Sequence, residues 1–195
     1  MGKLSDGTLY PTNYTLDAGN EPMTLDVIRL GIDRARQTAH QPENWLVDSS
    51  PWTLIERPAS RDATKVLRQA IVHGPELLRG FSDRVSLESI QQVPMEASLA
   101  LLAPTSISLY RTTNYRGNQR ARGQFSLGSG DNTTYDLAIT DPVWEGSIIQ
   151  NGSQELRQID CRFLITVSLG EPFGLFCYKL IAAIIPLEPS QTRAL

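Results

Sequence analysis

The residues most able to do chemistry lie in one short window that combines arginines with tyrosines. Its members are Tyr110, Arg111, Tyr115, Arg116, Arg120 and Arg122. No acidic residue lies between Glu96 and Asp131, so this window carries +4, and the rest of a chain whose total is −3 carries −7. Proteins that bind single strands combine positive charge for phosphates with aromatic faces for bases. The window therefore indicates a nucleic-acid interface; the alternatives are a solvated basic hairpin or a surface for an acidic partner protein.

His40 and Glu43 are the next candidates, as metal ligands or as an acid–base pair. Two ligands without a third are weak evidence for a metal, and Pro42 between them disfavours a helix. We expect His40, Asn44 and Trp45 to fix a loop against the fold instead. Because no compact carboxylate or histidine cluster is visible in the sequence, we expect no catalytic residues, no metal and no cofactor.

The cysteines, the apolar runs and the N-terminal residues indicate the cellular compartment. Cys161 and Cys177 form no CxxC pair and are interpreted as free core thiols. The longest apolar run, 180–185, is far shorter than the roughly 20 residues of a membrane helix. Residues 1–6 contain no apolar signal-peptide region. We therefore expect a cytoplasmic protein with no membrane partner.

The elements that must position the basic window are predicted to be mainly β-strands. Runs of alternating or β-branched residues predict strands at 24–32, 98–102, 107–111, 162–169 and 176–185. Residues 125–127 and 135–140 flank the turn-forming stretch 128–132 and predict a hairpin, and 144–150 predicts a helical turn. Five or six short strands with a small helix before the last pair favour a small barrel of the OB type.

The N-terminal half adds a helix and a candidate boundary. Apolar residues at helical spacing predict a helical segment over 62–80, broken near His73-Gly74-Pro75. Pro94 marks the boundary. The predicted fold is thus mainly β (α+β), with two small tandem OB-like β-barrels, the first incomplete and carrying the helical insertion. The first unit spans 1–95, the second barrel 96–186, and a C-terminal tail 187–195.

Four pairs of segments carry a family resemblance. They are 25–30 with 40–45, 81–85 with 98–102, 135–137 with 140–142, and, most specifically, 167–173 running into 177–185. Together they resemble the bacterial dual OB-domain family, small proteins of two tandem OB folds associated with prokaryotic conflict and defence loci. The resemblance covers about residues 25–185. It implies nucleic-acid binding or sensing and supplies no catalytic residues.

The start of the chain departs from that family. Members usually begin with a stretch that carries a Cys-containing strand and a Trp-Ile-Arg-Pro-like segment, and this sequence has neither. The resemblance therefore implies an N-terminally shortened first unit or a gene start that is set too late.

Two functions remain open from the sequence. The first is a non-catalytic nucleic-acid-binding or nucleic-acid-sensing protein of a prokaryotic defence system. Its ligand would be single-stranded or structured DNA or RNA, and it could have an effector protein as a partner. The alternative is an adaptor that docks on an effector and has no affinity for nucleic acid.

Overall fold

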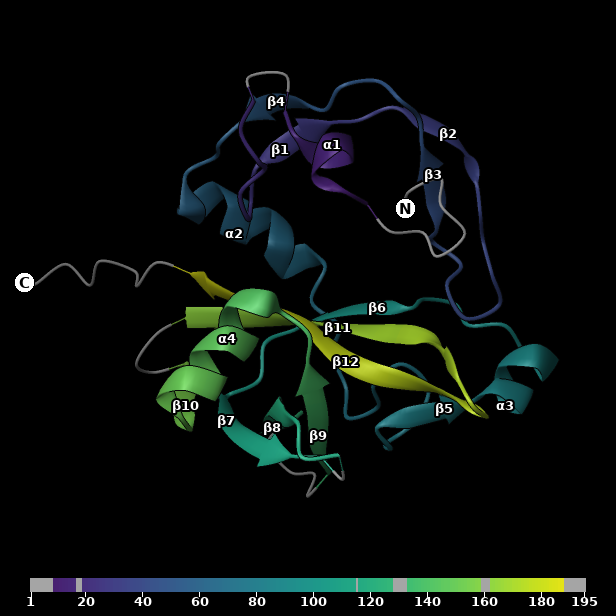
Figure 1. The fold of residues 1–195 in the computed structure, drawn as a ribbon, viewed down its shortest axis with the longest axis vertical. Coiled ribbons are helices and arrows are strands. Elements are labelled where there is room, and N and C mark those ends of the chain that lie inside the picture. Colours follow the sequence, from purple (N-terminus) through teal and green to yellow (C-terminus); the bar gives the residue numbers. More distant parts are fainter. Residues whose placement is uncertain (1–8, 17–18, 115, 128–132, 159–161, 188–195) are drawn as a thin grey trace, which may run out of the picture.

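The computed structural model describes residues 9–16, 19–114, 116–127, 133–158 and 162–187, with only the backbone described at positions 60 and 61. Tyr115, Cys161, the 128–132 turn and the tail beyond Leu187 lie outside the described residues. Figure 1 shows a large C-terminal sheet with a smaller N-terminal unit beside it, and helix α2 between the two in that view.

The C-terminal part is an eight-stranded sheet. Its strands are β5 (Arg84–Ser86), β6 (Leu99–Leu102), β7 (Ser106–Thr113), β8 (Gln119–Ser126), β9 (Thr134–Ile139), β10 (Gln154–Arg157), β11 (Arg162–Phe173) and β12 (Phe176–Leu187). They pair in the order β10-β7-β8-β9-β12-β11-β6, and β5 pairs with β12. The β9–β12 pair is parallel and the others are antiparallel. Within the described residues no ladder joins β6 to β10, so the barrel is open.

Alternating side chains of this sheet build the main core. Tyr135, Leu137 and Ile139 of β9 are at most 2% exposed, whereas the residues between them are partly exposed. Gly123 of β8 faces the same core, where a Cβ would lie 2.6 Å from Ile181 Cδ1. No side chain fits there without displacing a core residue, so close packing explains this glycine.

Helix α4 (Pro142–Asn151) covers one part of the core, between β9 and β10 in sequence. Asp141 caps its start, because one carboxylate oxygen accepts hydrogen bonds from the Val143 and Trp144 N–H groups. The other oxygen accepts from the Ile184 N–H at 3.1 Å, and the Trp144 Nε1–H donates to the Ile184 carbonyl at 2.9 Å. The cap therefore also fixes α4 to β12.

Most of the predicted C-terminal elements are confirmed. The strands expected at 98–102, 107–111, 162–169 and 176–185 correspond to β6, β7, β11 and β12, and the helical turn expected at 144–150 lies within α4. The predicted hairpin is the antiparallel β8–β9 pair. Strand β11 is longer than expected, because it pairs with β12 as far as Phe173.

The N-terminal unit contains two small ladders and helix α1 (Pro11–Tyr14). Strands β1 (Val27–Arg29) and β4 (Thr53–Glu56) pair, as do β2 (Ile32–Ala35) and β3 (Trp45–Val47). Buried Leu16, Val47 and Trp52 form its core. This unit is the incomplete one, since its ladders do not join into a single sheet among the described residues.

The single strand predicted over 24–32 is wrong. Leu25 has a positive φ of 75°, and the chain divides into β1 and β2, which pair with different partners. Between them lies Gly31, where a Cβ would overlap the Asp48 carboxylate. The Asp48 carboxylate thus occupies the space of a side chain at the break, and a local hydrophobic pattern does not reveal this contact.

The helical segment predicted over 62–80 is wrong in its second half. Helix α2 (Ser60–Gln69) ends before Ile71, which forms a parallel bridge with Leu101 of β6. The Val72 N–H also donates to the Leu101 carbonyl at 2.8 Å. The free edge of β6 offers unpaired backbone groups, and pairing with them replaces further helical turns.

The boundary predicted at 95/96 does not separate the sheets. Strand β5 and helix α3 (Leu87–Gln92) precede it, yet β5 pairs with β12 of the C-terminal sheet. At the other end, Leu187 was expected to begin the tail, but it lies in β12 and is buried. The C-terminal sheet therefore recruits residues from both sides of the predicted unit.

A backbone strap over residues 75–80 crosses the core beside β9 and β12. Leu78 and Arg79 have positive φ angles of 41° and 60°, which are unfavourable for side chains with a Cβ. The ammonium group of Lys179, which is 1% exposed, donates to the Gly80 carbonyl at 2.8 Å. The Tyr135 hydroxyl donates to the Pro75 carbonyl at 2.5 Å. These two buried donors hold the strap in its strained conformation.

Burial lowers the pKa of Lys179 to about 8, against the opposing influence of Glu76 and Asp83. The unfolded chain therefore binds more protons than the folded chain between about pH 8 and the ordinary lysine pKa, and stability rises with pH across that window. We expect wild type to gain stability relative to Lys179→Met, by on the order of 2 kcal/mol, between about pH 7 and about pH 10. Urea unfolding of both proteins measures this gain. If the stability difference between wild type and Lys179→Met stayed the same across this pH range, the folded protein would not lower the pKa of Lys179.

Candidate nucleic-acid interface

The predicted basic window forms the β7–β8 hairpin. Tyr110 pairs directly with Arg122, and Arg111 with Ala121. Directly paired residues point to the same side of a sheet. Ala121 is buried in the core, so Tyr110 and Arg122 lie on the outer face. Arg120 shares that outer face, because it is two residues from Arg122, whereas Arg111 alternates to the opposite side.

Tyr110 and Arg122 bind the same carboxylate. The Tyr110 hydroxyl donates to Asp136 Oδ2 at 2.6 Å, and Arg122 Nε donates to Asp136 Oδ1 at 2.9 Å. Arg122 Nη2 also donates to the Asp136 backbone carbonyl. Burial and the hydrogen bond to Asp136 raise the pKa of Tyr110. Burial alone would lower the pKa of Arg122, but the bond and charge of Asp136 raise it above its ordinary value. This trio is a structural clamp, and its net charge is zero.

Two of the other arginines contact helix α4. Arg111 Nη1 donates to the Ile149 carbonyl at 3.0 Å, in the last turn of the helix, where a cation is favoured by the helix dipole. Arg120 Nη1 lies 3.8 Å from Glu145 Oε1. The Arg120 side chain remains 58% exposed, so this surface pair is weak and can exchange for another anion.

Arg116 occupies the turn of the hairpin and is exposed. The Asn114 side-chain oxygen accepts from the N–H groups of Arg116 and Asn118 and thereby orders the turn, and Gly117 supplies its positive φ of 80°. The structure thus brings Arg116 and Arg120 to the exposed end of the hairpin. It places Tyr110 and Arg122 on the same face in a neutralised clamp and Arg111 on the other face.

An aromatic group on the same sheet was missed from the sequence. Arg84 of β5 lies over the Phe176 ring, with 4.7 Å from Cζ to the ring centroid, and 5.8 Å from the Tyr178 centroid. The Tyr178 ring centroid is 6.4 Å from that of Phe176 and 6.5 Å from that of Phe173. Aromatic residues at 173, 176 and 178 around a turn were a usable signal, but their arginine partner is remote in sequence.

Comparison with known protein families assigns this chain to a family. A family model described as dual OB-containing domain matches residues 2–184. The chain belongs to the dual OB-containing domain family. No curated protein and no solved structure matches it. The family resemblance found in the sequence is therefore confirmed. In this dual OB protein the N-terminal ladders are the less complete unit, and the β5–β12 sheet with α4 is the larger OB-like unit.

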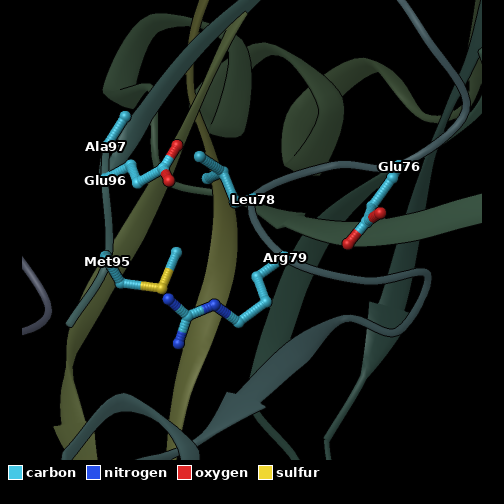
Figure 2. A pocket seen from close by; sticks show the side chains of 6 residues that line it. All are labelled: Glu76, Leu78, Arg79, Met95, Glu96 and Ala97. Atoms are coloured by element: carbon cyan, nitrogen blue, oxygen red, sulfur yellow. The ribbon is translucent and has the colours of Figure 1, made fainter. Parts of the chain in front are cut away.

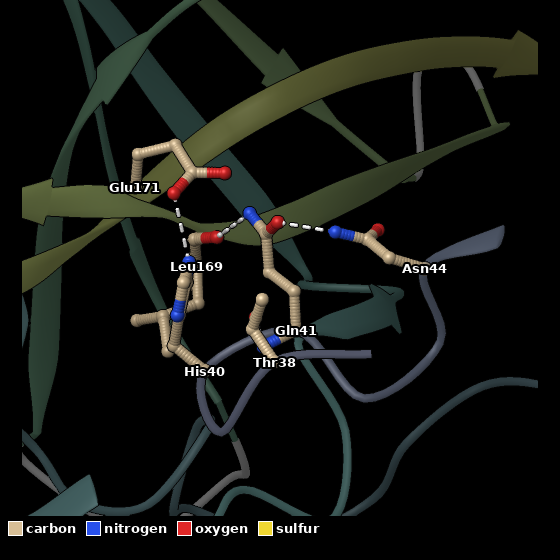
Figure 3. A network of polar contacts seen from close by, with 6 residues as sticks. All are labelled: Thr38, His40, Gln41, Asn44, Leu169 and Glu171. Carbon is tan, nitrogen blue, oxygen red and sulfur yellow. Dashed lines mark hydrogen bonds and ion pairs between the residues drawn. The ribbon is translucent and has the colours of Figure 1, made fainter. Parts of the chain in front are cut away.

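His40 and Glu43 connect the two units of the dual OB protein. His40 Nε2 lies 2.9 Å from Glu171 Oε2, Gln41 Nε2 donates to the Leu169 carbonyl, and Asn44 donates to Gln41 (Figure 3). Glu43 accepts hydrogen bonds from the Ser98 N–H and hydroxyl, at 2.6 and 2.8 Å. These bonds hold the 38–44 loop against β11 and the start of β6. The two side chains have different partners and do not form an acid–base pair.

A cleft of about 320 Å³ lies beside the strap (Figure 2). It is lined by Glu76, Leu78, Arg79, Met95, Glu96 and Ala97. The Arg79 guanidinium donates to the carbonyls of Val93 and Pro94, at 2.6 and 2.8 Å, just beyond α3. The Arg79 charge therefore caps the C-terminal end of helix α3.

The described residues contain neither a metal-binding cluster nor a membrane-spanning helix. No group of three or more His, Cys, Asp or Glu side chains among the described residues is arranged to hold a metal ion. No helix in the described part of the chain is long and apolar enough to cross a membrane. The buried thiol of Cys177 has a raised pKa, through burial and then the Glu171 charge, which disfavours a reactive thiolate.

The Glu43–Ser98 contact predicts an acid-sensitive junction. Burial alone would raise the pKa of Glu43, but the Ser98 hydrogen bonds lower it below 4.5. Its stabilisation is then complete above the unfolded pKa and is lost as pH falls through the folded pKa. We expect Glu43→Gln to lower the urea midpoint at neutral pH, and its deficit relative to wild type to disappear once the pH falls below the pKa of Glu43 in the folded protein. The control is Glu88→Gln, an exposed change on α3. A deficit that persists in acid would contradict the predicted role of the Glu43 charge.

Proposed function

We propose that this dual OB protein is a non-catalytic, cytoplasmic nucleic-acid-binding protein whose phosphate contacts centre on Arg116 and Arg120. The observation that supports this most directly is the exposure of both side chains at one end of the β7–β8 hairpin. OB folds bind oligonucleotides on the face of their second and third strands, which correspond here to β8 and β9. Arg120 lies on that outer face.

Charge distribution supports the same site. Strands β7 and β8 and the turn that connects them together contain four arginines and no acidic residue, although the whole chain has a net charge of −3. The clamp on Asp136 neutralises Arg122, and the α4 carbonyl engages Arg111. Arg116 and Arg120 lie exposed at the end of the hairpin, where a phosphate backbone can approach them. In a prokaryotic defence system, the role implied by the resemblance, such a surface would sense foreign nucleic acid.

A second function, docking on an effector protein, has one observation in its favour. Each of the four short strands of the N-terminal unit carries a large apolar side chain that is 46–53% exposed: Val27, Ile32, Trp45 and Ile55. Scattered apolar exposure is common, whereas four such residues on four short strands favour a contact surface. Pull-down of one defined protein from the native host, with no nucleic-acid affinity in the purified chain, would select this function instead.

The phosphate contacts are tested by the double variant Arg116→Ala/Arg120→Ala. Each phosphate contact releases counterions, so the loss of two contacts should weaken binding. For a single strand, the slope of log affinity against log salt concentration should become less steep by about 1.4. Fluorescence anisotropy with labelled DNA and RNA at several salt concentrations measures both effects. The matched control, Arg29→Ala/Arg68→Ala, removes the same charge from exposed sites on β1 and α2 and should leave the slope unchanged. Absence of binding by wild type at low salt would refute the proposed function.

A substitution of Asp136 should raise the affinity for nucleic acid, whereas the double arginine variant should lower it. Asp136→Asn removes the charge that neutralises Arg122 but keeps an oxygen to accept its hydrogen bond. We expect affinity for nucleic acid to rise a few-fold at low salt and the gain to fade at high salt. Unchanged affinity would confine the phosphate contacts to the hairpin turn and exclude the face around Arg122.

A further inference from the structure

The β11–β12 hairpin tip presents aromatic rings to solvent instead of burying them. Phe173 is 77% exposed, although its ring packs only 6.5 Å from that of Tyr178. Strand pairing places Phe173 opposite Phe176 and Tyr178 opposite Arg84, so the four side chains share one side of the sheet. We refer to Arg84, Phe173, Phe176 and Tyr178 as the aromatic platform.

The platform lies on the same face as the proposed phosphate contacts. Tyr178 and Leu180 alternate to one side of β12, and Leu180 pairs with Ala138 of β9. Ala138 in turn pairs with Arg122, which pairs with Tyr110. Paired residues share a side at every step, so the register carries one continuous outer face from the platform across β9 to the basic hairpin.

Arg84 makes this group more than an apolar patch. Its guanidinium makes two cation–π contacts, with Phe176 and Tyr178, and its side chain is still 46% exposed. Asp83 Oδ1 is 3.7 Å from Arg84 Nε, a distance typical of a weak surface pair. A planar guanidinium beside aromatic rings offers both a stacking surface and positive charge. Covering it with an apolar partner protein would remove water from that charge and offer nothing in its place.

We propose that the aromatic platform binds unpaired nucleobases and makes this protein selective for single strands over duplexes. The inference rests on the proposed function, because it requires a strand held on the same face. Bases in a duplex are stacked on one another and cannot reach an aromatic ring on a protein surface, whereas a single strand can turn its bases onto Phe173. Base stacking on an aromatic side chain contributes a few-fold to a hundred-fold in affinity and tolerates any sequence.

The experiment compares three ligands of equal charge per strand: an unstructured single strand of about 12 nucleotides, an abasic strand of the same length, and a matched duplex. Phe173→Ala should weaken binding to the ordinary single strand about five-fold or more and leave binding to the abasic strand unchanged. The salt slope should not change, since no phosphate contact is removed. Wild type should prefer the single strand to the duplex, and the variant should lose that preference.

The matched control is Leu175→Ala, which removes an apolar side chain of similar exposure, 75%, two residues away. Arg84→Lys keeps the charge but removes the planar group, and we expect it to weaken single-strand binding as well. Because Phe173 is exposed, its truncation leaves the core intact, and circular dichroism can confirm the fold.

The outcomes separate the two proposals. If wild type binds single strands through Arg116 and Arg120 but Phe173→Ala has no effect, the platform inference fails and the proposed function stands. Equal losses for Phe173→Ala and Leu175→Ala, or an equal loss on the abasic strand, would also overturn base stacking. Capture of a protein ligand at this tip, with no binding of any nucleic acid by wild type, would overturn both.

Discussion

The pairing of β11 with β12 is the constraint on which the rest of this structure depends. Both strands have twelve residues, and each pairs along both edges: β11 with β12 and β6, and β12 with β11, β9 and β5. The N-terminal loop also attaches to β11, at the Leu169 carbonyl and Glu171. On β12, Lys179 holds the strap. Loss of this one hairpin would therefore release β5, β6 and one edge of β9, together with the contact between the units.

The elements that could be predicted from the sequence are those whose information is local. The β8–β9 hairpin, α4 and the strands β11 and β12 each carry their pattern within a few residues, as alternation, a cap or a turn signal. The errors arise where a distant partner decides the structure. Residues after Gln69 leave the helix because β6 offers an edge, and β5 joins the sheet because β12 lies opposite it. The strand predicted over 24–32 divides at 30–31 because β1 and β2 pair with different strands, β4 and β3.

The candidate site shows the same division between local and remote information. A count of charges in the sequence locates the basic window but weights its four arginines equally. The structure separates them by their neighbours: Asp136 engages Arg122, the end of α4 engages Arg111, and Glu145 only loosely engages Arg120. The acidic partners lie on β9 and α4, beyond the acid-free window. Equally, the platform combines three residues from one hairpin with Arg84, about ninety positions earlier, and no short motif could have contained it.

If the proposed function holds, this face divides the work of recognition between two kinds of force. Arginines at the β7–β8 turn would act through charge, which attracts any phosphate backbone and weakens as salt screens it. The aromatic platform would act through contact with a base, which salt hardly affects and which a duplex cannot offer. Between them lies the Asp136 clamp, whose carboxylate cancels the charge of Arg122 and keeps the middle of the face from holding phosphate strongly. A strand would thus be attracted at one end and selected at the other, and a duplex attracted to the same arginines would gain nothing from the platform.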